Sequence, residues 1–178
     1  MRLFYLCGDK GVIKMRIMSM DQSTKKSGWA IFDENQYVCS GVVDKTKSEL
    51  DTYERSFDMA KDLWKIIAKY KPERLIIEDV QNQQNTNTVI VLSRLQGMII
   101  GYAESHGIQT YILLPSQWRK ALSYRQGPKV KREELKQESL DYVKKHFRLD
   151  VCEDQAEAIC INDAAHKIYN FEADLWGE

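Results

Sequence analysis

The sequence of 178 residues predicts an α/β fold in which one mixed, five-stranded sheet carries helices on both faces. Three short apolar runs follow one another near the amino-terminal end, joined by brief polar links, which is typical of an antiparallel meander. Beyond that region, segments with helical periodicity alternate with two further short apolar runs, which indicates strands connected by helices. Hydrophobic residues make up 43% and charged residues 29% of the chain, as in ordinary globular domains.

The first three expected strands are residues 16–21, 28–33 and 36–43. The first run is apolar until it stops at Asp21, and a polar loop separates it from Gly28, where the second run begins. We therefore expect the Asp21 carboxylate to project from the end of a buried strand. A turn-capping role is the alternative, because Asp is common in turns.

The middle of the chain alternates between helix and strand. Apolar residues recur with a period of 3.6 over residues 49–70, and Pro72 ends this helix. Residues 74–80 form a short apolar strand that ends in carboxylates. An amide-rich loop over residues 82–88 leads into a second helix over residues 89–105.

Gly97 and Gly101 lie one turn apart on this second helix. Each glycine weakens a helix by about 1 kcal/mol relative to alanine. We therefore expect a close neighbour at this position, either a sheet or a second subunit.

The remaining elements complete the alternation. Residues 108–114 read as the fifth strand, and residues 115–122 as a short helix opened by proline. After a loop over residues 123–128, helices are expected over residues 129–147 and 155–169.

We assign residues 16–178 to a single domain and residues 1–15 to an amino-terminal extension or extra strand. No apolar run approaches the roughly 20 residues of a membrane span, so we expect a cytoplasmic protein without membrane contact. The cysteines match no zinc or CxxC spacing and are expected to be free and mostly buried: Cys7, Cys39, Cys152 and Cys160.

Four carboxylates occur where predicted elements end or begin: Asp21, Glu78, Asp154 and Glu157. Oxygen ligands of this kind suit Mg²⁺, which is usually shared between protein carboxylates and substrate phosphates. Converging carboxylates can hold two such ions for in-line attack of water on a phosphodiester. The sequence lacks the GxSxG, HExxH and P-loop motifs that would support other chemistries.

These residues resemble the RuvC-type Holliday junction resolvases of the ribonuclease H-like nuclease superfamily. The resemblance extends from about residue 16 to residue 166 and rests on an ordered set of short motifs: Asp21 with Gly28-Trp-Ala, Leu75-Ile-Ile-Glu78-Asp-Val, and Asp154-Gln-Ala-Glu157-Ala-Ile with His166. Two positions depart from the family pattern. Glu157 replaces the usual Asp or His, and Gln81 with a run of amides replaces an aromatic residue after Glu78.

The resemblance implies a ribonuclease H-like fold and a structure-selective DNA endonuclease. It assigns catalysis and metal binding to Asp21, Glu78, Asp154 and Glu157, with two Mg²⁺ ions per site and Mn²⁺ as an alternative. Hydrolysis of a four-way DNA junction would leave 5′-phosphate and 3′-hydroxyl ends. It also implies a homodimer, with branched DNA as the partner and no small-molecule cofactor.

Local charge indicates where DNA would lie. The whole chain has a formal net charge of zero, but residues 116–148 contain ten basic and four acidic residues. Phosphate backbones require local positive charge of this kind. We expect DNA contacts at ten positions: Lys25, Lys26, Gln81, Asn82, Gln83, Arg119, Lys120, Lys129, Lys131 and Arg132.

Several alternatives remain open at this point. From Lys136 onward the basic residues alternate with acidic ones, so a solvated helix face is also consistent with the pattern. Most tryptophans read as core residues, but Trp118 lies among basic residues and is a candidate stacking platform. Alternative functions are a ribonuclease H-like nuclease acting on RNA or RNA–DNA hybrids, and a non-catalytic module that binds branched DNA.

Overall fold

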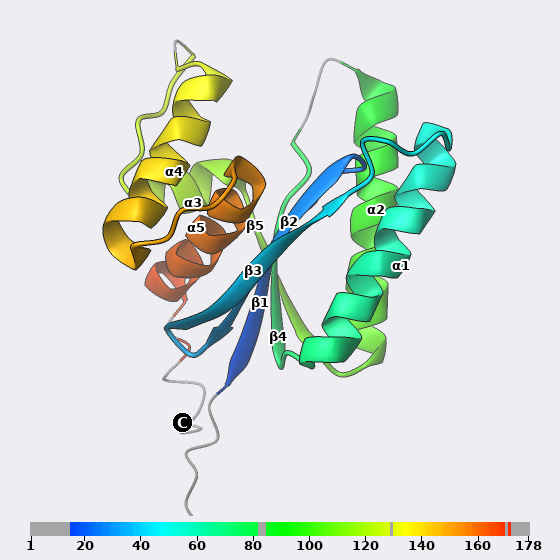
Figure 1. The fold of residues 1–178 in the computed structure, drawn as a ribbon, viewed down its shortest axis with the longest axis horizontal. Coiled ribbons are helices and arrows are strands. Elements are labelled where there is room, and N and C mark those ends of the chain that lie inside the picture. Colours follow the sequence, from blue (N-terminus) through cyan, green and yellow to red (C-terminus); the bar gives the residue numbers. More distant parts are fainter. Residues whose placement is uncertain (1–14, 82–84, 129, 170, 172–178) are drawn as a thin grey trace, which may run out of the picture.

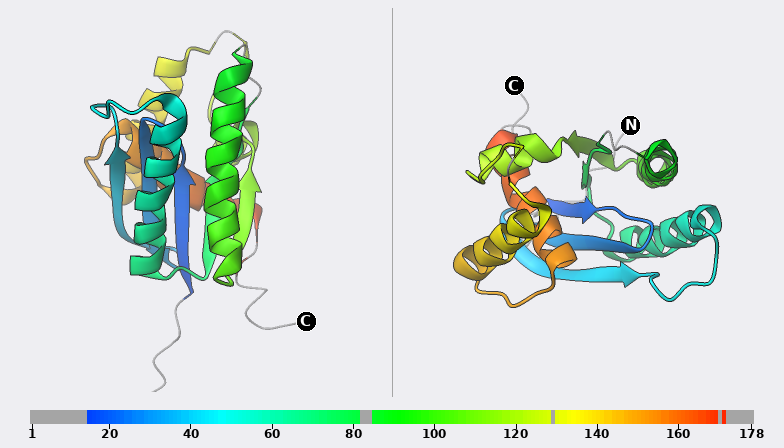
Figure 2. Two further views of the ribbon diagram at one scale, coloured as in Figure 1. Left: turned by 90° about the vertical axis from the view of Figure 1, so that its right-hand side faces the viewer. Right: turned by 90° about the horizontal axis from the view of Figure 1, so that it is seen from above.

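The computed structural model describes residues 15–81, 85–128, 130–169 and 171. Within them, a central sheet separates two layers of helices (Figure 1). Helices α1 (Thr52–Tyr70) and α2 (Thr86–Ser105) cover one face, and α3 (Pro115–Ala121), α4 (Arg132–Phe147) and α5 (Glu153–Ile168) lie on the other. In Figure 2, the left view shows α1 and α2 side by side in front of the sheet, and the right view shows the sheet between the two groups of helices.

The sheet has five strands in the order β3-β2-β1-β4-β5. The first three form the expected antiparallel meander, in which Met18 of β1 pairs with Ile31 of β2. Strands β1, β4 and β5 run parallel, with Met18 opposite Leu75. Their carboxyl ends therefore meet at one edge of the sheet. The strands are β1 (Arg16–Asp21), β2 (Lys26–Asp33), β3 (Gln36–Asp44), β4 (Arg74–Glu78) and β5 (Gln109–Leu113).

Side-chain alternation divides the core between the two faces. Met18 and Met20 of β1 pack with buried residues of α1 and α2, whereas Ile17 packs toward α5. Ser19 also faces α5, because its hydroxyl donates a 2.7 Å hydrogen bond to the carbonyl oxygen of Ala158. The period of two along a strand then directs Asp21 to this same face.

Four helices begin at other residues than expected, and in α1 and α2 a side-chain cap sets the start. Helix α1 begins at residue 52 rather than 49, since the Asp51 carboxylate accepts hydrogen bonds from the next backbone N–H groups. Helix α2 begins at residue 86 rather than 89, behind the cap Asn85. Helices α4 and α5 begin at residues 132 and 153 rather than 129 and 155.

Three further expectations are corrected. Lys26 belongs to β2 and not to the preceding loop. Strand β4 ends at Glu78 rather than at Val80. Of the free thiols that the structure describes, Cys160 is buried but Cys152 is exposed, so the expectation of buried cysteines fails at Cys152.

The two glycines of α2 do not contact the sheet. A Cβ atom built on Gly97 or Gly101 would meet no heavy atom within 4 Å. The outer side of α2 therefore faces open space within the described chain, so the close neighbour expected at these glycines is not the sheet. None of the described helices combines the length and the apolar character needed to cross a membrane.

Candidate active site

Strand geometry brings two of the predicted carboxylates together. Asp21 ends β1 and Glu78 ends β4, and these strands are parallel neighbours. Ile76 packs toward the α5 side of the sheet, so the alternation along β4 directs Glu78 to that side as well. Both carboxylates therefore lie at the carboxyl edge of the sheet, where ligands bind in open α/β sheets.

Helix α5 supplies the other two carboxylates from its first turns. Gly28 stands opposite Asp21 in the β1–β2 pairing. A Cβ atom at Gly28 would lie only 1.8 Å from the backbone oxygen of Asp154, so the absence of a side chain admits the start of α5. Asp154 is thereby placed beside Asp21, and Glu157 follows almost one turn later.

All four carboxylates line one cleft of about 920 Å³. Five of the residues expected to contact DNA also line it: Lys25, Lys26, Gln81, Arg119 and Arg132. Arg119 is only 18% exposed, and its guanidinium lies 4.0 Å from a carboxylate oxygen of Glu157. It is therefore part of the carboxylate cluster and not of an open surface.

Other predicted contacts lie outside this lining. Lys120 and Lys131 are exposed but are not among the cleft-lining residues. Asn82, Gln83 and Lys129 fall outside the described residues. His166 stands near the end of α5, edge-to-face with Phe171, and does not line the cleft.

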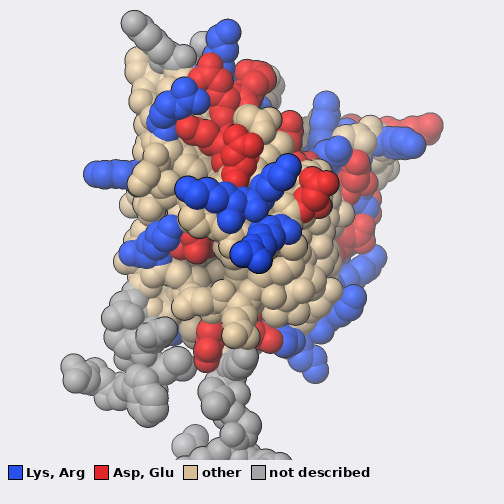
Figure 3. Space-filling view, turned by 60° about the vertical axis from the view of Figure 1, so that its left-hand side comes forward, with Lys and Arg blue, Asp and Glu red and all other residues tan. Residues whose placement is uncertain are grey.

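The more distant basic residues form ion pairs. Arg125 contacts Glu138 at 3.0 Å, and Lys136 contacts Glu153 at 2.5 Å. Figure 3 shows basic and acidic side chains interspersed on the face that carries α3, α4 and α5. This arrangement favours a solvated helix face from Lys136 onward.

Burial, together with mutual repulsion, perturbs the acidic residues of the cleft. Burial, followed by the charges of Glu157, Glu78 and Asp154, raises the pKa of Asp21 well above its usual range. The contact with Glu157 adds to this rise in the pKa of Asp21. Burial raises the pKa of Glu157 as well, against the opposing charges of Arg119 and Lys136.

Glu78 has a different environment. Burial raises the pKa of Glu78 to about 7, although the Trp118 N–H and the Arg119 charge favour its ionised form. The indole Nε1 of Trp118 donates a 2.6 Å hydrogen bond to Oε2 of Glu78. Trp118 is fully buried, so the alternative of a DNA-stacking platform is wrong for this residue.

Two residues at the site, Trp118 and Arg55, were not predicted from the sequence to belong to it. Trp118 was considered only as core or as a stacking surface, because its contact with Glu78 spans 40 positions in the sequence. Arg55 lines the cleft from α1, and its guanidinium donates to the Leu50 carbonyl and to Thr52. The sequence pattern of an amphipathic helix does not distinguish Arg55 from other surface basic residues. Its position one turn after the Asp51 cap is the one feature that places it near the start of the helix.

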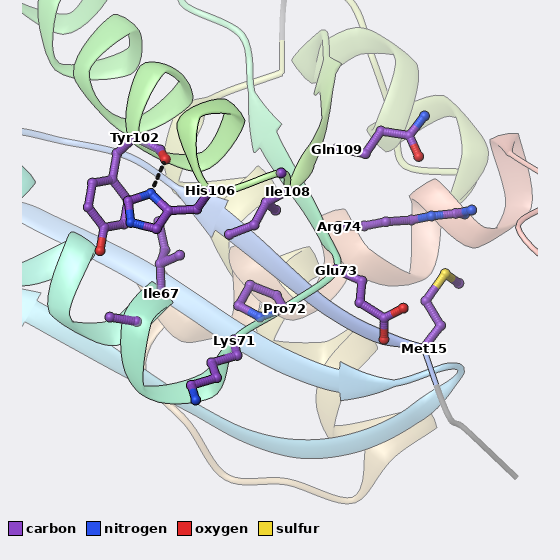
Figure 4. Close-up of a pocket in the computed structure, with 12 residues that line it drawn as sticks. Met15, Ile67, Lys71, Pro72, Glu73, Arg74, Tyr102, His106, Ile108 and Gln109 are labelled. Atoms are coloured by element: carbon purple, nitrogen blue, oxygen red, sulfur yellow. Dashed lines mark hydrogen bonds between the residues drawn. The ribbon is translucent and has the colours of Figure 1, made fainter. Parts of the chain in front are cut away.

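A second cavity of about 770 Å³ lies at the opposite end of the sheet (Figure 4). Its lining includes Ile67, Pro72 and Ile108, and Glu73 is its one carboxylate among the described residues. The imidazole of His106 approaches the carbonyl oxygen of Tyr102 at 2.8 Å at its margin. This cavity lacks the converging carboxylates of the cleft.

The fold and the acidic cleft together define a nuclease of the ribonuclease H-like class. A match to the family described as "Crossover junction endodeoxyribonuclease RuvC" covers residues 17–161. The chain therefore belongs to the RuvC family, whose members are metal-dependent nucleases. The predictions of a ribonuclease H-like fold and of a RuvC-type endonuclease are confirmed.

Curated relatives agree with this assignment. The crossover junction endodeoxyribonuclease RuvC of Fusobacterium nucleatum is 35% identical over 107 residues, which cover 58% of this chain and 56% of the relative. The match therefore spans little more than half of that relative's length. The protein of the same name from Roseiflexus is 27% identical over 162 residues, covering 88% of this chain and 96% of the relative.

Solved structures show the same fold. T. thermophilus RuvC in complex with Holliday junction substrate superposes with a TM-score of 0.69 at 16% identity, covering 86% of this chain and 93% of that one. The yeast mitochondrial Holliday junction resolvase gives a TM-score of 0.56 at 16% identity, with coverage of 86% and 78%.

Proposed function

We propose that this protein resolves four-way DNA junctions by hydrolysing phosphodiester bonds with Mg²⁺ held by Asp21, Glu78, Asp154 and Glu157. The observation that carries this proposal is the convergence of these four carboxylates, from three separate elements, in one cleft. The products would be 5′-phosphate and 3′-hydroxyl ends. We keep the expected two ions per site, with Mn²⁺ as an alternative, and the cytoplasmic location stays a prediction.

The donor set fits a hard divalent cation. The charges of Glu157, Glu78 and Asp154 all raise the pKa of Asp21, and a bound cation would relieve this repulsion. Among the described residues, no three Asp, Glu, His or Cys side chains lie together as a metal-binding group. Mg²⁺ keeps several waters and takes ligands from substrate phosphate, so it can bind between carboxylates that line one cleft.

The roles of the other residues follow from charge. When bound, divalent cations supply Lewis-acid chemistry that lowers the pKa of water and stabilises a leaving oxygen. Arg119, beside Glu157, would balance negative charge on the reacting phosphate. Lys25, Lys26 and Arg132 would hold the flanking DNA backbone along the cleft.

We further propose a homodimer that uses the outer side of the α1–α2 layer. This side carries large exposed apolar residues, namely Tyr53 and Phe57 of α1 and Ile90 of α2. Tyr53 and Phe57 pack edge-to-face, and the Arg94 guanidinium lies over the Tyr53 ring, so α1 and α2 form one continuous surface. The open space at Gly97 and Gly101 would let a second subunit approach closely.

A cleavage assay on four substrates tests this function. We expect Mg²⁺-dependent cleavage of a four-way junction, with less cleavage of a Y-fork and none of a linear duplex or an RNA–DNA hybrid. Preferred cleavage of the hybrid would instead identify a ribonuclease. Binding of junctions without cleavage at any metal concentration would identify a non-catalytic binding module.

Asp21→Asn separates catalysis from binding. The change removes a charge but keeps the side-chain shape, so we expect cleavage to be abolished while junction affinity stays within a few-fold. Asp163→Asn is the matched control, because Asp163 pairs with Lys167 on α5 and does not line the cleft. Loss of junction binding in Asp21→Asn would contradict the metal-ligand role.

A further inference from the structure

Glu78 is held by three elements at once. The side-chain amide of Gln22, directly after β1, donates a 2.6 Å hydrogen bond to the Glu78 carbonyl oxygen. The amide of Gln96, on α2, donates to the same oxygen at 2.9 Å. Trp118, on α3, donates to the side-chain carboxylate at 2.6 Å. Both the main chain and the side chain of this residue are therefore fixed.

The indole of Trp118 is itself immobilised. Its side chain is fully buried in the core between the sheet, α3 and α5. Its ring packs edge-to-face against Tyr124, with centroids 5.6 Å apart, and the Arg119 guanidinium lies 4.8 Å from the ring centroid. The Nε1–H group thus points at Glu78 from a rigid support.

We propose that Trp118 is a positioning residue for Glu78. It occupies one carboxylate oxygen, fixes the side-chain rotamer and leaves the other oxygen for a divalent cation in the cleft. The indole N–H group can donate a hydrogen bond but cannot accept one. Trp118 therefore always acts as the donor and favours the ionised carboxylate of Glu78. This role rests on the proposed function, in which Glu78 is a metal ligand.

Outer-shell hydrogen bonds of this kind orient metal ligands. Their removal typically lowers metal affinity or activity by about 10-fold to 100-fold. A carboxylate that has lost its buried donor is also free to rotate away from the productive geometry. Trp118 should therefore affect the Mg²⁺ requirement of cleavage far more than the affinity for DNA.

Trp64 provides a matched control. Its indole N–H also donates to an oxygen in a largely buried setting, the Met98 carbonyl at 3.2 Å, and its ring stacks on Tyr102. Trp64 lies on α1, on the opposite side of the sheet from α5. Trp64→Phe and Trp118→Phe each remove an indole N–H donor and the same ring atoms. Only Trp118→Phe removes a hydrogen bond to Glu78.

The first measurement is the Mg²⁺ concentration that gives half-maximal junction cleavage. We expect it to rise about tenfold in Trp118→Phe and to remain unchanged in Trp64→Phe, with junction affinity within about twofold of wild type in both. Equal Mg²⁺ requirements in Trp118→Phe and wild type would overturn the positioning role.

The second measurement is made on the wild-type protein and does not depend on cleavage activity or on the folding of a variant. In the ¹⁵N-labelled wild-type protein, titration with Mg²⁺ alone should shift the indole N–H resonance of Trp118 and leave that of Trp64 in place. An unmoved Trp118 resonance would overturn the proposal, even if Trp118→Phe were inactive, because the loss would then be structural.

Glu78→Gln separates the positioning role of Trp118 from the metal-ligand role proposed for Glu78. If Glu78→Gln still cleaves junctions, Glu78 is not an essential ligand, and the positioning role of Trp118 is wrong with it, while absence of Mg²⁺-dependent junction cleavage by the wild type would overturn the proposed function itself. If Glu78→Gln is inactive while Trp118→Phe has a normal Mg²⁺ requirement, only the positioning role is wrong.

Discussion

At the scale of single residues, the cleft places ionisable groups where protons and cations compete. The pKa of Glu78 is raised to about 7, mainly by burial, and the pKa of Asp21 is raised by burial and by its acidic neighbours. In the absence of a cation the folded protein therefore holds protons that the unfolded chain releases. Stability and metal binding must both depend on pH in this range.

The stability that protonated Glu78 contributes is fully present below its unfolded-state pKa of about 4.5 and is lost as the pH rises through about 7. The loss is on the order of 3 kcal/mol. In a chelating buffer, the free energy of unfolding of the wild type should therefore fall relative to Glu78→Gln between pH 4.5 and 8. Parallel profiles from urea titrations would contradict this. Mg²⁺ should stabilise the wild type more at pH 8 than at pH 5.5.

Substitution of Gly28 tests the close packing that positions Asp154 beside Asp21. In Gly28→Ala the new Cβ atom would overlap the Asp154 backbone oxygen, so the start of α5 must move away from Asp21. We expect destabilisation of about 3 kcal/mol in urea titrations and a large loss of cleavage at saturating Mg²⁺. Normal cleavage by Gly28→Ala would show that Asp154 tolerates displacement.

At the scale of elements, apolar runs and helical periodicity predicted the five strands and five helices of the described residues, since each buries an apolar face. Helix starts were displaced because caps such as Asp51 and Asn85 act through single hydrogen bonds. The four carboxylates were predictable because each stands at an element boundary. The contact of Trp118 with Glu78 was not, because it depends on how α3 packs against the end of β4, which no local pattern encodes.

The start of α4 provides an element-scale prediction for DNA binding. Lys131 and Arg132 stand at its amino-terminal end, and Arg132 lines the cleft. In the Asp21→Asn background, alanine at each position should weaken junction binding and reduce the slope of log affinity against log salt by about 1. Lys144, in the last turn of α4, is the control and should leave the slope unchanged. Equal slopes in all three variants would place the DNA elsewhere.

At the scale of the whole molecule, the two helical layers have different tasks. The sheet edge and α5 supply the carboxylates of the cleft, whereas α1 and α2 add lining residues such as Arg55 and Val91, bury one side against the sheet and leave the other exposed (Figure 1). A four-way junction has two equivalent strands to cut, so a symmetric enzyme requires a second copy of the chain. The exposed apolar side of α1 and α2 is the surface we assign to that contact.

Ile90→Asp tests this surface, because a buried charge in a dimer contact is strongly unfavourable. We expect sedimentation to show a shift from dimer to monomer. On a cruciform plasmid, the paired cuts that give a linear product should be replaced by single nicks, with the Mg²⁺ requirement unchanged. Val38→Asp is the matched control, since Val38 on β3 is 44% exposed and Ile90 is 41% exposed. A dimeric Ile90→Asp that still linearises the plasmid would exclude this surface as the subunit contact.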